Sequence, residues 1–228
     1  MLGCLALAIP LSAQDNTRYE FWPEVDAYLK LSQRSRIFFM YSMTKLDDRQ
    51  TFADGSIGIH YDWYGGRTLL PRIKFREAAK HQTVLFRVGY EVTRTPSESG
   101  KTVGERTPMF EAHARTPLPW KLLITDRNRF DLRFVGATFT PRYRNRLKIE
   151  RTFKIGRFEL TPYAQAEVFY DWRWNAFNRQ RYTGGAEWGI ASFLVLEGYS
   201  TMQRDTKSSP EYLYAGGVAL QFYFNRGH

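Results

Sequence analysis

The sequence predicts an all-β fold: a closed antiparallel transmembrane β-barrel of about twelve strands with a polar, charged lumen. Three observations lead to this prediction. Apolar and polar residues alternate over long segments, so each segment would form a strand with one apolar and one polar face. The chain starts with a segment typical of exported proteins. All six tryptophans fall near the ends of the alternating segments, where a membrane protein places its interfacial aromatic residues.

The N-terminal segment differs from the rest of the chain. Residues 2–13 are uncharged and apolar, end in small residues, and are too few to span a membrane. We therefore predict a signal peptide at residues 1–14 and one outer-membrane barrel domain over residues 15–228. The alternative is a buried N-terminal helix or strand, against which Pro10 and the abrupt change at Asp15 argue. Cys4 is the only cysteine, so a mature chain would hold neither a disulfide nor a cysteine metal site.

Eleven segments show the alternation, with turn-forming residues between them. They cover residues 21–31, 36–45, 56–64, 83–94, 106–116, 121–134, 142–150, 158–172, 179–190, 193–204 and 212–224. One apolar position from each segment, in chain order, is Val25, Phe39, Ile59, Val88, Phe110, Leu132, Leu147, Ala166, Trp188, Leu196 and Leu220. The polar positions between them carry most of the charged residues. Each segment is long enough for the ~9–11 residues that a barrel strand needs to cross a bilayer.

The number of strands follows less directly. Bacterial barrels have an even number, which brings both termini to the periplasmic side. Residues 69–76 alternate weakly and are the candidate for a twelfth strand; counted otherwise, they are a loop, and the range is ten to twelve. The connections are short near residues 32–35, 117–120, 154–156 and 191, and longer at 46–55, 95–105, 171–178 and 204–211. This asymmetry is typical of tight periplasmic turns and longer outer loops.

A soluble β-sandwich also alternates, with its apolar face turned inward. The long strands, the export segment, the aromatic strand ends and the final sequence Phe222-Tyr223-Phe224 favour the membrane barrel instead. An aromatic residue at the end of the last strand is the signal that the barrel-assembly machinery binds, so we expect Phe222 and Phe224 to contact it. The other expected partners are outer-membrane lipid and lipopolysaccharide. We expect the protein in the outer membrane of a Gram-negative bacterium.

Four sequence motifs together resemble one protein family. They are Glu20-Phe21-Trp22-Pro23-Glu24-Val25-Asp26, residues 126–133 (DRNRFDLR), residues 142–147 (RYRNRL) and residues 161–170 (TPYAQAEVFY). In order and spacing they are similar to the bacterial family of outer-membrane barrels called domain of unknown function twenty-four-ninety. The resemblance covers nearly all of the mature chain. It implies a barrel in the outer membrane, but no activity and no functional residues.

The polar faces predict a charged network inside the barrel. Its candidate solute contacts are Arg127, Arg129, Asp131, Arg133, Arg142, Arg144, Arg146, Lys148, Glu150, Glu167, Arg179, Arg181 and Glu187. A secondary lumenal group is His60, Asp62, Glu111 and His113. A two-residue turn at Ile155-Gly156 would place Arg144 opposite Glu167 and Lys148 opposite Tyr163, so that opposite charges meet across the strands.

Several functions fit this network. It either simply fills the lumen and fixes the barrel, or it lines a narrow passive channel. The net charge of +10 and the rows of arginine also fit a porin-like path that selects anions or acidic oligosaccharides. A lipid-modifying enzyme is a further alternative, with His60, Asp62 and Ser42 as candidates, although no clear nucleophile and base pair is present. We expect no catalysis, no cofactor and no metal, and no nucleic acid, because the aromatic residues lie opposite the arginines.

Overall fold

The computed structural model describes residues 16–46, 52–68, 80, 82–96, 102–156 and 158–225. These residues form the strands β1 (Thr17–Lys30), β2 (Ser35–Leu46), β3 (Phe52–Thr68), β4 (Gln82–Pro96), β5 (Thr102–Leu118), β6 (Leu122–Asp131), β7 (Phe134–Val135), β8 (Thr138–Phe139), β9 (Arg142–Arg151), β10 (Phe153–Ile155), β11 (Phe158–Asp171), β12 (Ala176–Ala191), β13 (Leu194–Asp205) and β14 (Tyr212–Asn225), and the short 3-10 helix η2 (Pro119–Lys121). No helix in this part of the chain is long and apolar enough to cross a membrane.

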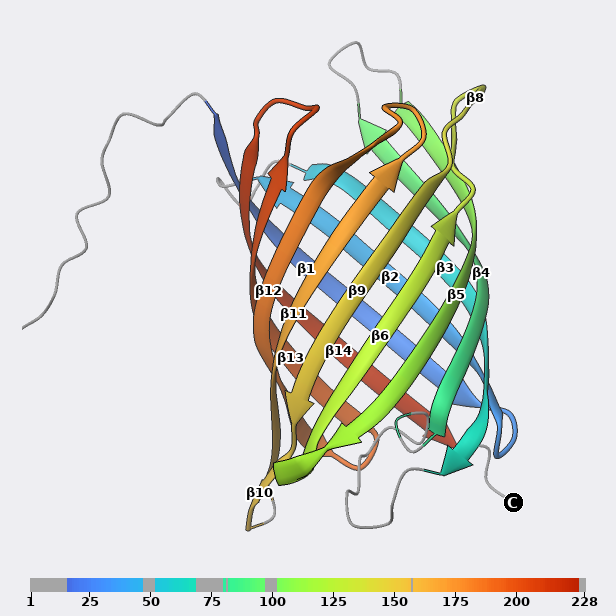
Figure 1. Ribbon diagram of the computed structural model, residues 1–228, viewed down its shortest axis with the longest axis vertical. Coiled ribbons are helices and arrows are strands. Elements are labelled where there is room, and N and C mark those ends of the chain that lie inside the picture. The colour runs from blue at the N-terminus through green and yellow to red at the C-terminus, as the bar shows by residue number, and fades with distance from the viewer. Residues whose placement is uncertain are drawn as a thin grey trace, which may run out of the picture.

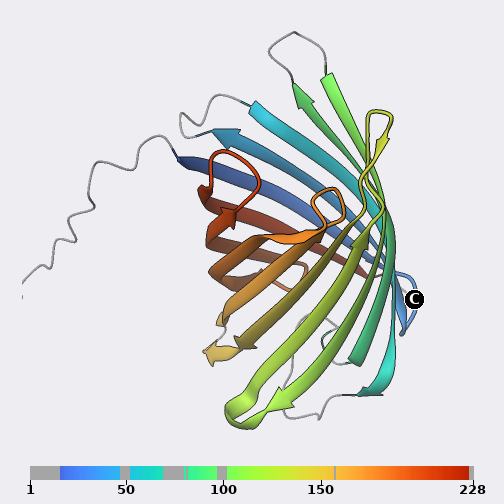
Figure 2. The same cartoon turned by 45° about the horizontal axis from the view of Figure 1, so that its top comes forward.

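Eleven of these strands form a closed wall (Figures 1 and 2). They are β1 to β6, β9 and β11 to β14, each paired with the next along the chain, with β14 paired back to β1. β7, β8 and β10 lie outside the wall as extensions of β5 and β11. The predicted closed barrel is therefore confirmed, and each of the eleven segments predicted from sequence forms a wall strand.

The closure of the wall has a feature that the sequence did not predict. Neighbouring wall strands are antiparallel, but β1 and β14 pair in parallel. An odd number of alternating strands leaves the first and the last pointing the same way, so the closing pair must be parallel. Thr17 and Asn225 consequently lie at opposite ends of the barrel, where an even number would have placed them together. The candidate twelfth strand at residues 69–76 lies outside the described residues.

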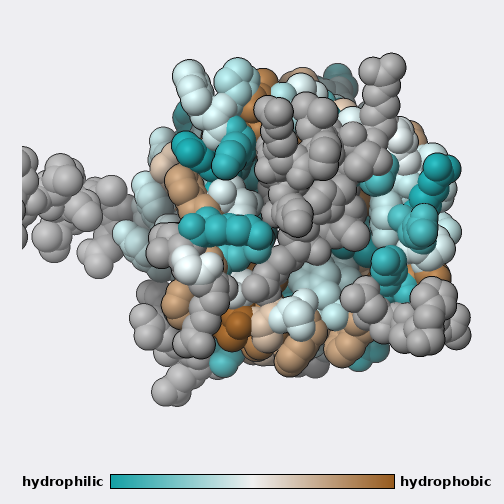
Figure 3. All heavy atoms as spheres, turned by 90° about the horizontal axis from the view of Figure 1, so that it is seen from below, coloured by the Kyte–Doolittle hydropathy of each residue, from teal (hydrophilic) through white to brown (hydrophobic). Residues whose placement is uncertain are grey.

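Burial in the barrel is reversed relative to a soluble protein. Among the described residues, ten buried side chains are hydrophobic, whereas twenty-five are polar or charged. Large apolar residues such as Ile57, Leu147 and Val218 point outward and are exposed. In the view from below, hydrophobic residues gather along the left and lower edges of the molecule (Figure 3). This distribution rules out the sandwich alternative, in which the apolar faces would meet inside.

Aromatic residues form two rows on the outer surface. Trp63, Trp120 and Trp188 are exposed near the end of the barrel that holds the β5–β6 turn, and Trp172 and Trp174 are exposed near the other end. Trp22 was also predicted to lie in this girdle, and that prediction is wrong. Its position on β1 turns it into the lumen, where its indole nitrogen donates to Glu20 at 2.7 Å.

The pairing of β9 with β11 is shifted by two residues from the predicted register. Ile155 pairs with Phe158, so the turn begins at Gly156 and not at Ile155. Gly156 has a φ of 61°, the left-handed conformation that such a turn requires. As a result Arg146, not Arg144, is the register partner of Glu167. All side chains keep their faces, because a shift of two residues preserves the alternation.

Glycines make room for inward-pointing rings. His60 on β3 stacks on Phe38 with 4.9 Å between ring centroids and lies flat over Gly58 and Gly89. A Cβ atom at position 89 would meet the Nδ1 atom of His60 at 2.0 Å and its Cγ atom at 2.8 Å. In the same way, Tyr199 covers Gly217, where a Cβ would lie 2.0 Å from the tyrosine ring. These glycines allow large rings to fill a narrow lumen.

The fit of His60 over Gly89 gives a stability prediction. Gly89→Ala should destabilise the barrel by about 2 kcal/mol, because the imidazole is held against Phe38 and cannot move away. Thermal unfolding followed by heat-modifiable gel mobility measures this. Gly184→Ala is the control, because no atom lies within 4 Å of its added Cβ. Adding His60→Ala should relieve most of the loss; if the double variant is no better than the sum of the two single variants, the clash is not the cause.

Candidate functional site

The lumen contains an elongated polar cavity of about 560 Å³. On β2 it extends from Arg36, near one end of the strand, to Thr44, near the other. The arginines and lysines that line it are Arg36, Lys80, Arg87, Arg115, Arg127, Arg129, Arg142, Arg144, Arg146, Lys148 and Arg181. The aspartates and glutamates that line it are Glu24, Asp26, Asp54, Glu91, Glu105, Glu111, Glu150, Glu167, Glu187 and Glu197.

Most of the residues predicted from sequence meet in this cavity. Those that line it are His60, Glu111, His113, Arg127, Arg129, Arg142, Arg144, Arg146, Lys148, Glu150, Glu167, Arg181 and Glu187. Asp62 and Asp131 are fully buried and bind arginines that line it. Arg133 and Arg179 instead form ion pairs near the end of the barrel that lies away from the β5–β6 turn. Their role as solute contacts stays a prediction.

The register of β6 and β9 brings like charges together. Arg127 pairs with Arg146, and Arg129 with Arg144, directly across the two strands. Such pairs are unfavourable on their own, and more so away from bulk water. The strands on either side supply the compensation: β5 places Glu111 opposite Arg129, and β11 places Glu167 opposite Arg146. The arginines of β6 and β9 thus lie between an acid on β5 and an acid on β11.

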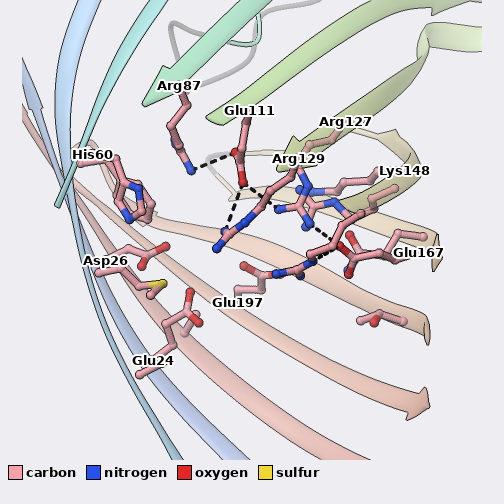
Figure 4. A pocket seen from close by; sticks show the side chains of 18 of the residues that line it. Glu24, Asp26, His60, Arg87, Glu111, Arg127, Arg129, Lys148, Glu167 and Glu197 are labelled. Carbon is pink, nitrogen blue, oxygen red and sulfur yellow. Dashed lines mark hydrogen bonds and ion pairs between the residues drawn. The ribbon is translucent and has the colours of Figure 1, made fainter. Parts of the chain in front are cut away.

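Glu111 is the most highly connected of these acids (Figure 4). It is buried, and its Oε1 atom accepts hydrogen bonds from Arg127 at 3.4 Å and Arg129 at 3.3 Å. Its Oε2 atom lies 2.9 Å from His113 Nε2 and 3.6 Å from Arg87 Nη1. One carboxylate on β5 therefore contacts cationic side chains from two neighbouring strands and a histidine from its own.

Glu167 and Asp131 neutralise the other side of the arginine cluster. Glu167 accepts hydrogen bonds from Arg127 and, at 2.9 Å, from Arg144 Nε. Asp131 accepts from Arg129 and from both Nε and Nη2 of Arg142, at 3.0 and 2.8 Å. The predicted contact between Arg144 and Glu167 is therefore present, although it runs diagonally between the strands because of the shifted register.

Two smaller groups extend the network along the barrel. Asp62 binds Arg36 Nε at 2.7 Å and Arg87 Nε at 2.6 Å. Towards the end with the short turns, Lys148 lies 2.9 Å from Glu150 and 2.8 Å from Glu187. Lys80 also contacts these two glutamates, at 3.1 and 2.9 Å. It lies between β3 and β4, so its ammonium group links that connection to β9 and β12.

The extension of β5 beyond the end of β6 carries its own ion pair. Arg133 Nε and Nη2 donate to the two carboxylate oxygens of Glu105 at 2.7 and 2.6 Å. Burial opposes ionisation of Glu105, but this bidentate pair outweighs it and holds the pKa of the carboxyl below its usual value. The pair lies beside β7, whose Val135 is the register partner of Glu105. It therefore stabilises the rim of the barrel.

The lumen as a whole is close to electrically balanced. Eleven basic and ten acidic residues line the described cavity, and Asp62 and Asp131 add two more acids beneath them. The positive charge of the arginine rows is therefore mostly neutralised within the barrel. Arg146 is an exception, because among the described residues no carboxylate lies within 4 Å of its guanidinium.

Three acids on one side of the cavity were not among the candidate solute contacts predicted from sequence. Glu24 and Asp26 on β1 and Glu197 on β13 all line it. Each stands on the polar face of its segment, so alternation identified them as inward-pointing. Their lack of basic partners could not be inferred, because it depends on which strands close the barrel.

The histidines do not complete a catalytic pair within the described chain. Neither ring nitrogen of His60 has a hydrogen-bond partner, and its closest ionic contact is Glu91 at 3.7 Å. Ser42 makes no hydrogen bond to it. Across the described residues, no group of three or more His, Cys, Asp or Glu side chains could hold a metal ion. The contacts thus give the enzyme hypothesis no support beyond the sequence pattern.

Comparison with known proteins identifies one family. Its model, described as "Protein of unknown function (DUF2490)", matches residues 20–213. No curated protein matches the chain. Among solved structures, the β-domain of the Bordetella autotransporter BrkA aligns with a TM-score of 0.42 and 10% sequence identity, over 81% of this chain and 82% of that chain. At that score and identity, the likeness says nothing about function.

Neutralisation of the arginine cluster by Glu111 gives a second stability prediction. Glu111→Gln keeps the size of the side chain but removes the charge that two buried arginines share. It should reduce the free energy of unfolding by about 3 kcal/mol, measured from the urea dependence of the heat-modifiable folded band. Glu211→Gln is the control, because its partner Arg204 is half exposed and the pair should contribute little. Equal stability of both variants would contradict the prediction.

Proposed function

The chain belongs to the DUF2490 family of proteins of unknown function, and on that premise we propose that it is an outer-membrane barrel with a narrow passive path for small polar solutes. The observation that carries the proposal is the reversed distribution of side chains. An apolar outer surface surrounds a polar cavity of about 560 Å³ that follows the barrel axis. A lipid environment makes such an outer surface favourable.

The dimensions of the outer surface support a membrane position. Phe177 and Trp188 both point outward on β12 and lie eleven residues apart. That separation is roughly 36 Å along a strand, or roughly 28 Å of height for a strand tilted by ~40°. The apolar band of outer-membrane barrels is about 25 Å tall, with aromatic residues at both edges. The two aromatic rows therefore stand where the two interfaces of a bilayer would be.

The direction of the barrel and its location are part of the proposal. Short turns join β1 to β2, β5 to β6 and β12 to β13 at the end that holds Asn225, which fits a periplasmic end, although the connection from β3 to β4 (residues 69–81) belongs to this end as well. Phe222 and Phe224 stack with 6.3 Å between ring centroids, and Phe224 is half exposed, so the pair is available to the assembly machinery. The proposed signal peptide at residues 1–14 lies outside the described residues.

Lipopolysaccharide is the proposed partner at the outer end. Because the lumen is nearly balanced, most of the +10 charge of the chain lies elsewhere. Exposed basic residues stand close to the outer strand ends: Arg94, Arg106, Arg173, Arg204 and Lys207. Phosphate groups of lipopolysaccharide would be attracted to them.

The balanced lumen supports a path without charge selectivity over the anion-selective alternatives. Anion or acidic-oligosaccharide selectivity was motivated by a surplus of arginine, and the acids around the arginines remove most of that surplus. A purely structural role is the alternative that the dense ion-pair network favours, because such a network fixes the wall strands to one another. A passive path differs from it in one measurable property, which is ion flow.

Conductance is the test of this proposal. Purified protein in planar bilayers should give small, stable currents, well below those of the 16- to 18-stranded porins whose lumen is an open aqueous channel. The ratio of chloride to potassium permeability should be near one. Recovery of the protein in outer-membrane fractions with heat-modifiable mobility is the accompanying control. A folded, membrane-inserted barrel without current would leave the structural role; recovery from the soluble periplasm would contradict the membrane proposal itself.

A further inference from the structure

We propose that the lumen binds small zwitterions, molecules with one ammonium and one carboxylate group, between two charged groups on opposite walls. The inference rests on the proposed function in that it requires a water-filled lumen. We call Glu24 and Asp26 the acidic pole, and Arg146 and Arg181 the basic pole. All four line the same cavity.

The acidic pole lacks a basic partner. Asp26 is 4% exposed; its Oδ2 accepts from the hydroxyl of Tyr28 at 3.2 Å, and its Oδ1 has no hydrogen-bond partner. Glu24 lies within hydrogen-bonding reach of Asp26. No arginine or lysine nitrogen of the described chain lies within 4 Å of either carboxyl group. Two adjacent carboxyl groups without a cation repel each other unless a proton or a bound cation lies between them, and the ammonium group of a ligand supplies that charge.

The neighbouring residues extend this pole without neutralising it. Glu197 adds a third acid from β13, held by the hydroxyl of Tyr163 and by Gln221 Nε2 at 2.6 Å. Both of its partners are neutral. In Figure 4, Glu24 and Asp26 lie on the side of the cavity opposite Arg127 and Lys148, apart from the network around Glu111. The acidic side of the lumen is therefore separated from the main group of arginines.

The basic pole holds the arginines that the network leaves least neutralised. The side chain of Arg146 forms no hydrogen bond or ion pair with the described residues, and its Nε atom is buried. Arg181 donates two hydrogen bonds to the neutral Gln203, at 3.0 and 2.6 Å, and comes no closer than 4.0 Å to Glu167. Guanidinium groups in this state bind a carboxylate through paired hydrogen bonds.

The topology places Arg146 opposite the acidic pole, whereas Arg181 on β12 is three strands from β1 and lies over the Trp22 ring of β1, 5.0 Å from its centroid. β9 and β1 are five strands apart in one direction around the wall and six in the other, so they face each other across the lumen. The barrel is roughly 22 Å across between backbones for eleven tilted strands. After two opposing side chains are allowed for, a gap of about the length of a small amino acid and its hydrogen bonds remains.

The register also places the poles at the same height. Residue pairing followed from Arg146 through β11, β12, β13 and β14 leads to Arg18, near the start of β1. Followed through β6, β5, β4 and β3, it leads to Arg34, in the turn after β1. Because the strands are tilted, the residues of β1 at the same height as Arg146 lie about midway between Arg18 and Arg34. Glu24 and Asp26 stand there.

Charge balance favours a zwitterion over a simple anion or cation. A carboxylate alone would neutralise Arg146 but leave the acidic pole unchanged, and an ammonium alone would do the reverse. A molecule with both groups neutralises both poles and adds no net charge to the lumen. This matters because charges are poorly screened there. Free amino acids and short peptides belong to this class.

Three probes of matched size test the inference: 4-aminobutanoate, butanoate and butylammonium. Binding to the purified full-length barrel in detergent is measured by ligand-observed NMR, so the result does not depend on conductance. The zwitterion should bind at least about tenfold more tightly than either singly charged probe, since each pole contributes one charge-assisted contact.

Variants assign the two ends of the ligand. Arg146→Gln should weaken 4-aminobutanoate binding at least about threefold and leave butylammonium binding unchanged. Glu24→Gln should weaken 4-aminobutanoate binding by a similar factor and leave butanoate binding unchanged. Lys121→Gln, an exposed position in the β5–β6 turn, is the control for loss of one positive charge. Heat-modifiable mobility checks that each variant folds, and both substitutions keep a polar side chain of similar size.

The outcomes separate the two proposals. Equal affinity for the three probes, or an unchanged preference in both pole variants, would overturn the zwitterion site whatever the conductance. Selective binding to a barrel that passes no current would support the site and contradict the passive path. Selective binding together with a zwitterion-dependent reduction of the potassium chloride current would support both.

Discussion

Every part of this structure depends on the neutralisation of charges that a closed wall forces into its interior. Each wall strand turns its apolar face outward, so its ionic face has nowhere to go except the lumen. Buried charges are costly unless partners lie within reach. Glu111, Glu167 and Asp131 meet that requirement for the arginines of β6 and β9. The strand order that closes the barrel is also the order that brings each of these acids beside its arginines.

The strands and their faces could be predicted because both are local properties. Alternation along residues 142–149 determines which side chains share a face, whatever the strand pairs with. The number of wall strands and the parallel closure were not predictable, because they depend on the pairing of β1 with β14, some two hundred residues apart. The register of β9 against β11 was missed because the turn could have begun at either of two adjacent residues, and only the backbone of Gly156 decides between them.

The candidate site shows the same division between local and distant information. Inward-pointing arginines were found from alternation, and their contact with Glu167 was expected. Their near-complete neutralisation was not, since Glu111 and Glu91 come from strands whose neighbours sequence alone does not specify. For the same reason the isolation of Glu24 and Asp26 from basic residues was not predicted. Their separation from any base makes one side of the lumen more acidic than the other, which a count of charges alone would not show.

The most direct test of this account is the accessibility of alternate positions along β9. Single cysteines are placed at 144, 146 and 148 and at 147 and 149, in a chain freed of Cys4, and the folded protein is reconstituted in lipid bilayers. A water-soluble thiol reagent should label the even positions, and a lipid-soluble quencher should reach labels at the odd positions. The reverse pattern, with odd positions open to water and even positions protected, would contradict a barrel with a charged lumen and a lipid-facing wall.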